Sequence, residues 1–159
     1  MSFPVMITLQ EIRDHSPCRS GWEKVLSANG GINADMNKQF ELSSIIDSNS
    51  VTDCIWALRC KPEHSNLWRK LAVVFADEVK HLMTDKRLSN ALDVAWLHSE
   101  GKASDDELYA AAYAAADAAA DAAADAAAYA AAYAAADARQ KQSEILRKAL
   151  TTGIVERTK

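Results

Sequence analysis

Residues 109–138 read YAAAYAAADAAADAAADAAAYAAAYAAADA, a four-residue repeat in which one Tyr or Asp precedes three alanines. Alanine has the highest helix propensity of all residues, and neither Gly nor Pro interrupts residues 104–152. The preceding segment Ser104-Asp105-Asp106-Glu107 has the form of a capping box and places three acids in a first helical turn. The repeat therefore predicts an α-helix that begins at Ser104.

The predicted helix is long for so small a chain. One uninterrupted helix over residues 104–150 contains 47 residues and is about 70 Å long. A compact domain of about 100 residues is only about 35 Å across. Such a helix must overhang its domain, pack on a second subunit, or break into a hairpin that packs on its own domain.

The four-residue period decides which residues share a face of this helix. Four residues turn an α-helix by about 400°, so each marked position lies about 40° further round than the last. The result is not a coiled-coil heptad but two tyrosine-marked faces at opposite ends and an acidic face between them. Tyrosine is favoured at protein interfaces, and an alanine surface allows close helix contact. The residues we expect to bind a partner protein are Tyr113, Asp117, Asp121, Asp125, Tyr129 and Tyr133. The alternative is a rigid, soluble strut.

The region before the repeat is predicted to be a small helical domain. Thr8-Leu9-Gln10-Glu11 is another capping box and predicts a short helix that stops near Ser16-Pro17. A second helix ends at Asn29-Gly30-Gly31, before a polar loop. Helical apolar spacing predicts further helices near residues 42–48, 50–60, 65–83 and 88–99. No segment shows sustained period-two alternation, so no sheet is expected.

The predicted fold class is therefore all-α, with a small helical domain followed by one long Ala-rich helix. The expected divisions are a core domain at 1–103, the helix at 104–150 and a flexible tail at 151–159. Ile55 and Leu58 are expected to face inward. The expected core consists of Trp56, Leu58, Leu71, Phe75, Val79, Leu92 and Trp96.

The three cysteines, Cys18, Cys54 and Cys60, show neither CxxC spacing nor an even count. We expect no secretory signal peptide before them. Free, mostly buried thiols in a reducing cytoplasm are therefore expected.

Charge and composition narrow the classes of partner. Residues 104–138 carry seven acids and no base, whereas residues 139–159 carry six bases and two acids. No basic footprint for nucleic acid is present, and no apolar run approaches the roughly 20 residues of a membrane span. DNA mimicry is a weaker alternative, because one Asp per roughly 6 Å of helix compares with one phosphate per about 1.7 Å of duplex.

No residue pattern indicates catalysis, a cofactor or a metal. The histidines are scattered, without HExxH or zinc-ligand spacing. The chain also lacks GxSxG, a P-loop and GxGxxG. We therefore expect a protein that is not an enzyme and has no cofactor.

The order of several segments resembles a group of small phage and prophage proteins related to putative bacterial immunity proteins. The segments are Ile7 to Ile12, Pro17-Cys18 with Gly21, Asp53 to Arg59, Asp85-Lys86-Arg87 with Ala91-Leu92 and Ala95, Gly101 to Ser104, and the Ala-rich tail. The usual tail of that group carries more Trp and Arg, whereas this one carries Asp and Tyr. The resemblance implies a helical, non-catalytic phage protein that acts inside a bacterium, by binding a component of host defence or a toxin.

The sequence thus predicts a cytoplasmic protein that binds and inhibits another protein, of the immunity or anti-defence type, for example an anti-CRISPR. The expected partners are another protein and a second copy of the chain, in a homodimer, and neither nucleic acid nor a membrane. The alternatives are an assembly protein with the helix as a strut, and a DNA mimic.

Overall fold

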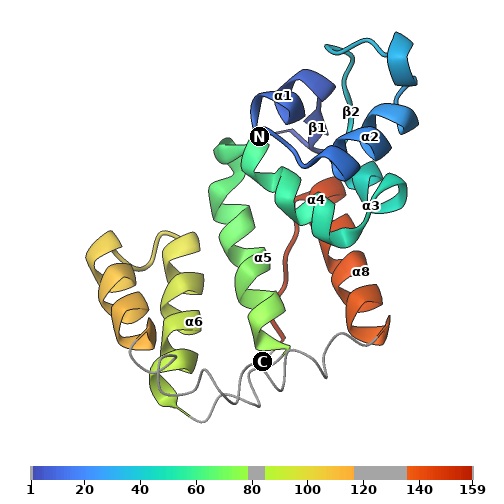
Figure 1. The fold of residues 1–159 in the computed structure, drawn as a ribbon. Coiled ribbons are helices and arrows are strands. Elements are labelled where there is room, and N and C mark those ends of the chain that lie inside the picture. Colours follow the sequence, from blue (N-terminus) through green and yellow to red (C-terminus); the bar gives the residue numbers. More distant parts are fainter. Residues whose placement is uncertain (1, 79–84, 117–135, 159) are drawn as a thin grey trace. The chain divides into compact units, whose positions relative to one another are not determined.

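The computed structural model describes residues 2–78, 85–116 and 136–158, and these residues are mostly helical (Figure 1). The chain divides into two compact units. Unit 1 contains Met1–Ser65 and Gln142–Ile154, and unit 2 contains Asn66–Lys141 and Val155–Lys159. Ser104, where the predicted long helix begins, belongs to unit 2, whereas residues 142–150 at its other end belong to unit 1.

Unit 1 contains a small sheet, so the expectation of no sheet was wrong. Strand β1 (Met6–Ile7) pairs antiparallel with β2 (Phe40–Glu41), with Met6 opposite Glu41 and Ile7 opposite Phe40. Strands of two residues are too short to produce a recognisable alternation of polar and apolar residues. The pairing is decided by the fold around it, in which the Leu42 N–H donates to the Val5 carbonyl.

The first two predicted helices are confirmed. Helix α1 (Leu9–Asp14) begins with the capping box, in which the Thr8 N–H donates to Glu11 Oε2 at 2.8 Å and the Glu11 N–H donates to Thr8 Oγ1 at 3.2 Å. Helix α2 (Arg19–Ala28) ends before Gly30, which has a φ of +114° that favours glycine. A 3-10 turn, η1 (Gly31–Asn33), follows inside the predicted polar loop.

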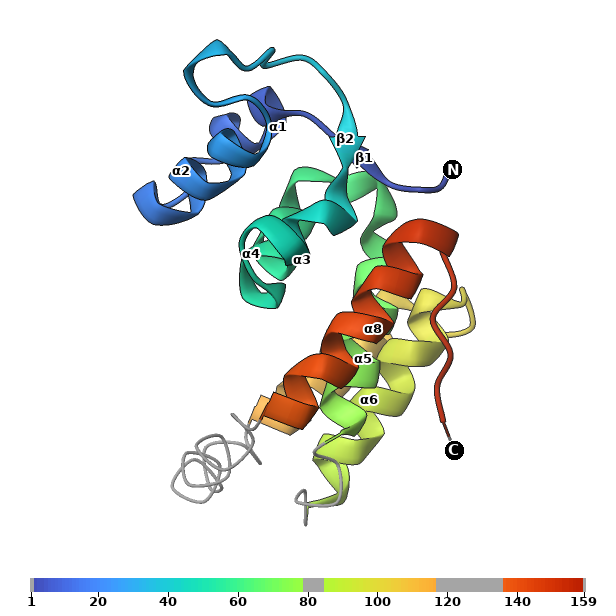
Figure 2. The same cartoon turned by 90° about the vertical axis from the view of Figure 1, so that its right-hand side faces the viewer.

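Short helices make up the rest of the first segment of unit 1. They are η2 (Leu42–Ser44), α3 (Ile45–Ser48), α4 (Val51–Ala57), η3 (Leu58–Cys60) and η4 (Pro62–His64). Helices α3 and α4 lie side by side (Figure 2). Ile55, expected to face inward, is 38% exposed, whereas Leu58 is buried as predicted.

Helix α8 spans Ala136–Thr152, and its residues from Gln142 onward belong to the second segment of unit 1. Leu146, Ala149 and Leu150 have no exposed surface. The Val5 N–H donates to the Leu150 carbonyl at 2.8 Å. This hydrogen bond joins the end of α8 to the residue that precedes β1. The last turn of α8 is therefore part of the core, not of a helix outside it.

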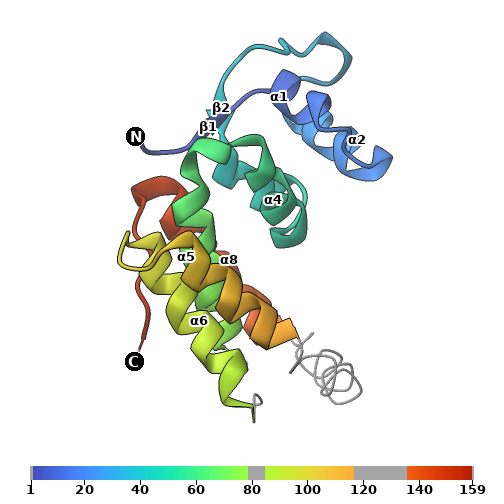
Figure 3. The same ribbon diagram turned by 90° about the vertical axis from the view of Figure 1, so that its left-hand side faces the viewer.

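Unit 2 is built around α5 (Ser65–Asp77), α6 (Lys86–Ser99) and a helix at 105–116, which lies beside α6 (Figure 3). Its buried apolar residues include Leu71, Val73, Val74 and Ala111. The Lys70 ammonium lies 5.1 Å from the centre of the Trp96 ring, a cation–π contact between α5 and α6.

The C-terminal residues of unit 2, expected to be a flexible tail, are held by ion pairs. Arg157 Nε and Nη2 donate to the two Asp77 oxygens at 2.6 and 3.0 Å. Arg157 Nη1 also lies 2.8 Å from Asp93 Oδ1. One guanidinium thus joins the C-terminal segment to α5 and α6.

The single long Ala-rich helix is not confirmed. Helices occupy 105–116 and Ala136–Thr152, and the second contains 17 residues. Residues 117–135 lie outside the described residues. The coarser prediction of a mostly helical protein is confirmed.

The expected core is confirmed in part. Leu58 and Leu71 are buried, and Val79 lies outside the described residues. Four of the predicted core residues are only half-buried: Trp56, Phe75, Leu92 and Trp96. Large aromatic side chains are often buried on one side only, because they are too large for a small core to enclose.

Candidate functional site

The helix at 105–116 has two unlike faces. Leu108, Ala111 and Ala115 follow one another at helical spacing on the face that packs into unit 2. On the opposite face, Tyr109 is 74% exposed and Tyr113 is 76% exposed. The two tyrosines are four residues apart and therefore neighbours on the helix surface. Together with exposed Asp106, they form what we call the tyrosine surface.

The first turn of this helix is fixed by two sets of hydrogen bonds. The predicted capping box is confirmed: the Ser104 N–H donates to Glu107 Oε2 at 2.7 Å, and the Glu107 N–H donates to Ser104 Oγ at 3.2 Å. The pKa of Glu107 is lowered by the bonds from Ser104. The tyrosine surface is therefore carried by a helix whose start is well defined.

A second network joins α5, α6 and the start of the 105–116 helix. Arg69 Nη1 lies 3.0 Å from His98 Nδ1, and His98 Nε2 lies 2.6 Å from Asp105 Oδ1. A guanidinium can only donate, so His98 Nδ1 is the acceptor of the bond from Arg69. His98 Nε2 then carries the hydrogen and donates it in a hydrogen bond to Asp105. The chain Arg69–His98–Asp105 holds the first turn against both neighbouring helices.

Only one of the predicted partner-binding residues is described. Tyr113 is highly exposed, as its assignment to a partner surface requires, and it lies one turn from Tyr109. The other five lie outside the described residues: Asp117, Asp121, Asp125, Tyr129 and Tyr133. Tyr109 belongs to the repeat but was not among the residues expected to bind a partner. It is as exposed as Tyr113 and lies next to it on the helix surface, because the two residues are four apart.

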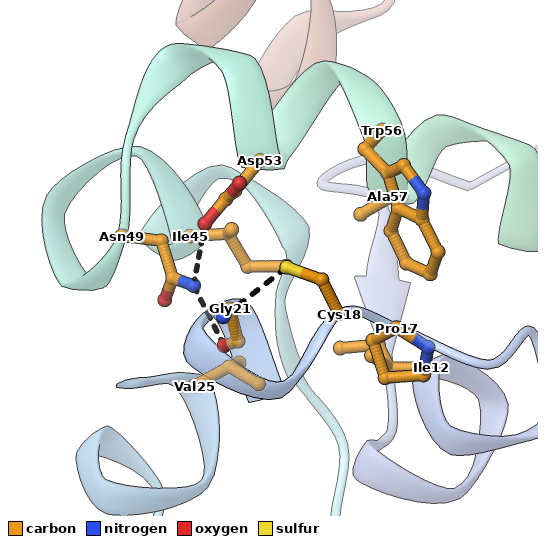
Figure 4. A pocket seen from close by; sticks show the side chains of 10 residues that line it. All are labelled: Ile12, Pro17, Cys18, Gly21, Val25, Ile45, Asn49, Asp53, Trp56 and Ala57. Atoms are coloured by element: carbon orange, nitrogen blue, oxygen red, sulfur yellow. Dashed lines mark hydrogen bonds between the residues drawn. The ribbon is translucent and has the colours of Figure 1, made fainter. Parts of the chain in front are cut away.

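A pocket in unit 1 was not expected from the sequence (Figure 4). It has a volume of about 110 Å3 and lies between the end of α1, the start of α2, and helices α3 and α4. Most of its wall is apolar. The lining residues are Ile12, Pro17, Cys18, Gly21, Val25, Ile45, Asn49, Asp53, Trp56 and Ala57.

The polar side of the pocket is organised by Asn49. Its amide nitrogen donates to the Gly21 carbonyl at 2.8 Å and to Asp53 Oδ2 at 2.9 Å (Figure 4). A Cβ at Gly21 would lie 3.2 Å from Cys18 Sγ and 3.4 Å from Asp53 Oδ2. The missing side chain therefore allows α2 to approach α4 closely enough for Asn49 to bridge them.

The three cysteines are free, and two of them are sealed from solvent. Burial raises the pKa of Cys54 to about 12 and that of Cys60 to about 11. Because the thiolate is the reactive form, these two thiols are unreactive near neutral pH. Cys18 is exposed at the mouth of the pocket, where its Sγ accepts from the Gly21 N–H at 3.4 Å.

Sequence reasoning missed the pocket because its residues come from separate helices with unremarkable local patterns. One signal was available: Pro17-Cys18, Gly21 and the segment from Asp53 are pieces of the noted resemblance, and the structure brings them together. A shared order of small segments can indicate a shared site even where no segment is a motif by itself.

The described residues contain neither a candidate metal site nor a helix suited to cross a membrane. No group of His, Cys, Asp and Glu within them could hold a metal ion. None of the described helices combines the length and apolar character that crossing a membrane requires.

Comparisons of the chain with family models, with curated proteins and with solved structures found no match.

Proposed function

We propose that this protein is a non-catalytic binding module that engages another protein through the tyrosine surface and the alanine repeat that follows it. The observation that carries the proposal is the exposure of Tyr109 and Tyr113, at 74% and 76%. Two large aromatic side chains on one helix face gain little from this position in the free protein. Tyrosine side chains are enriched among the residues that contribute most to protein interfaces.

Rigidity of the surface supports the same proposal. The Ser104 capping box and the Arg69–His98–Asp105 chain fix the helix start, so the tyrosines are presented without a large ordering cost on binding. Asp106 adds a carboxylate at the same face. A partner with apolar and basic groups, able to contact tyrosine rings and neutralise carboxylates, fits this surface.

The wider role we propose is inhibition of a bacterial protein in the host cytoplasm by a phage-type protein, of the immunity or anti-defence kind. The resemblance in the order of segments supports this class. The aspartates that follow Tyr113 in the sequence would steer a basic partner towards the tyrosine surface. A role as an assembly strut is the competing reading.

The test is a quantitative capture from bacterial lysate with three forms of the full chain. The first is the wild type, the second is Tyr109→Ala with Tyr113→Ala, and the third is Leu97→Ala. Leu97 is the matched control, because it is an exposed apolar residue of the same unit at 40% exposure. Alanine is a better helix former than tyrosine, so the double variant should remain helical.

A partner held by the tyrosine surface should bind the double variant at least about thirtyfold more weakly, the effect of one true hot spot. It should bind the Leu97→Ala variant normally. A partner that binds all three forms equally would contradict the proposal and favour a strut.

A second copy of the chain is the first partner to examine. Sedimentation of the wild type and the double variant at tens of micromolar compares their association directly. A homodimer formed by the tract should weaken in the double variant. A compact monomer in both would exclude self-association and leave a different protein as the partner.

A further inference from the structure

We propose that the pocket of unit 1 binds a small organic cation, an ammonium or guanidinium group carried on a compact apolar body. This site is separate from the tyrosine surface, and it does not depend on the function proposed above. Three features of the pocket support this: its size, the hydrogen bonds already made by its polar groups, and the lack of an ion-pair partner for the Asp53 carboxylate among the described residues.

The walls select an apolar body of limited size. Ile12, Val25, Ile45 and Ala57 are buried and present aliphatic surface to the cavity, which has a volume of about 110 Å3. Pockets for drug-sized ligands typically measure about 300–1,000 Å3. The pocket therefore suits one ring or a short branched chain.

The hydrogen-bond donors on the Asn49 side of the pocket are already in use. Both amide hydrogens of Asn49 are taken, by the Gly21 carbonyl and by Asp53 Oδ2. The Gly21 N–H donates to Cys18 Sγ, and the Asp53 N–H donates to Ser50 Oγ at 3.0 Å. On the Asn49 side of the pocket, the polar capacity that remains is the acceptor capacity of the Asp53 carboxylate. A ligand that uses it must be a donor.

Asp53 also lacks a counter-charge. No Lys, Arg or His of the described segments forms an ion pair with it. The carboxylates of Glu11, Asp47 and Asp77 do have such partners. A half-buried carboxylate in apolar surroundings is more stable with a cation beside it. A positively charged donor in the pocket would satisfy both requirements.

Trp56 supplies surface and not charge recognition. Arg59 lies over its ring, with Cζ 4.6 Å from the centroid, and Arg59 Nε donates to the Trp56 carbonyl at 2.9 Å. The ring nevertheless lines the pocket, and like Asp53 it is carried by α4 (Figure 4). A ligand that pairs its cation with Asp53 would place its apolar body towards the indole.

The test compares two probes of equal shape on the full chain: benzylamine, which is a cation at pH 7, and benzyl alcohol, which is neutral. Binding is measured by NMR titration of the backbone amides and the tryptophan indole N–H groups. We expect saturable shifts at Gly21, Asn49 and the Trp56 indole. Benzylamine should bind about tenfold to a hundredfold more tightly than benzyl alcohol, the range for a hydrogen bond to a charged group.

Three variants assign this preference to Asp53. Asp53→Asn should reduce benzylamine binding to the level of benzyl alcohol, whereas Asp53→Glu should keep the preference for the cation. Asp14→Asn is the control, because Asp14 is an exposed carboxylate of the same unit that lies outside the pocket lining. It should bind like the wild type.

Equal affinity of the wild type for the two probes would overturn the proposal, and so would shifts confined to other parts of the chain. This comparison needs no variant, so the proposal remains testable if Asp53→Asn fails to fold. An unchanged preference in a folded Asp53→Asn protein would also overturn it.

Discussion

The two helices that flank the alanine repeat use their residues in opposite ways. The helix at 105–116 buries Ala111 and exposes both tyrosines, whereas α8 buries Leu146, Ala149 and Leu150 completely. Both segments have a high content of good helix formers. Helix propensity is therefore not what distinguishes them. Side-chain size and placement decide that α8 buries two leucines in a core, whereas the helix at 105–116 buries small residues and presents two tyrosines to solvent.

The lesson concerns long regular sequences. Alanine fixes helical backbone with little apolar area, so a run of it carries little information about where the helix packs. The leucines at 146 and 150 lie four residues apart and provide that information for α8. If α8 packs through its leucines and the helix at 105–116 presents its tyrosines to solvent, truncation of these side chains should affect stability very differently.

The largest effect should come from Leu150→Ala. Leu150 is fully buried in unit 1, so its truncation should lower the free energy of unfolding by about 2–5 kcal/mol. Tyr113→Ala, at a 76% exposed position, should change it by less than about 0.5 kcal/mol. Urea denaturation followed by circular dichroism measures both. Similar losses for the two variants would remove the distinction between the helices.

A smaller effect is expected where α8 ends. Gly153 has a φ of +73°, and a Cβ there would fall 2.5 Å from Cζ of Phe3. Gly153→Ala should therefore lower stability by about 1–3 kcal/mol, through backbone strain and overpacking. Gly101 is the matched control, because its φ is +74° but a Cβ there meets nothing within 4 Å. Gly101→Ala should lower stability less than Gly153→Ala does. Thermal unfolding measures both variants, and equal losses of stability would show that the Phe3 contact is unimportant.

The next smaller effect is expected at the two arginines near the C-terminus, whose replacement should lower stability by different amounts. Arg157 pairs with Asp77, and their side chains are 17% and 15% exposed. Arg147 pairs with Asp47, and theirs are 42% and 69% exposed. Arg157→Lys should cost about 1–2 kcal/mol because a half-buried two-point contact is lost. Arg147→Lys should cost under about 0.5 kcal/mol, since solvent screens the exposed pair. Chemical denaturation measures both losses. A larger loss of stability in Arg147→Lys than in Arg157→Lys would contradict the expectation that the more buried ion pair contributes more.

The smallest effect is the acid dependence of the α1 cap. Burial alone would raise the pKa of Glu11, but hydrogen bonds from Lys61 and Thr8 lower it below its ordinary value of 4.5. A carboxyl with a depressed pKa stabilises the fold above pH 4.5, and this contribution is lost as the pH falls through the lowered pKa. The Glu11 side chain is 37% exposed, so the effect should stay under about 1 kcal/mol.

Melting curves between pH 7 and pH 3 test this point with Lys61→Met. Removing the ammonium should make stability less dependent on pH in the acid range than it is in the wild type. An identical pH dependence in the two proteins would show that Lys61 does not perturb Glu11.

Local chemistry in the sequence predicted the helix starts well. The boxes at Thr8 and Ser104, the end at Asn29, and the mostly helical class were all readable, because capping and helix propensity involve neighbours within about four residues. The face assignments were less secure. Ile55 has the spacing of an inward residue but is exposed, because a short helix that continues into a 3-10 turn does not keep one regular face.

Tertiary structure alone decided the features that join distant residues. The pairing of Met6 with Glu41, the burial of Leu150 beneath the first residues of the chain, and the pocket formed by Gly21, Asn49 and Asp53 have no local signature. Each depends on contacts between segments whose approach is set by the packing of several helices at once. The sequence by itself determined that the chain is helical and where its helices begin, because those are short-range properties. Which helix surfaces are buried and which are left for partners was decided only by the tertiary packing, because apolar area is removed from water only where complementary surfaces meet.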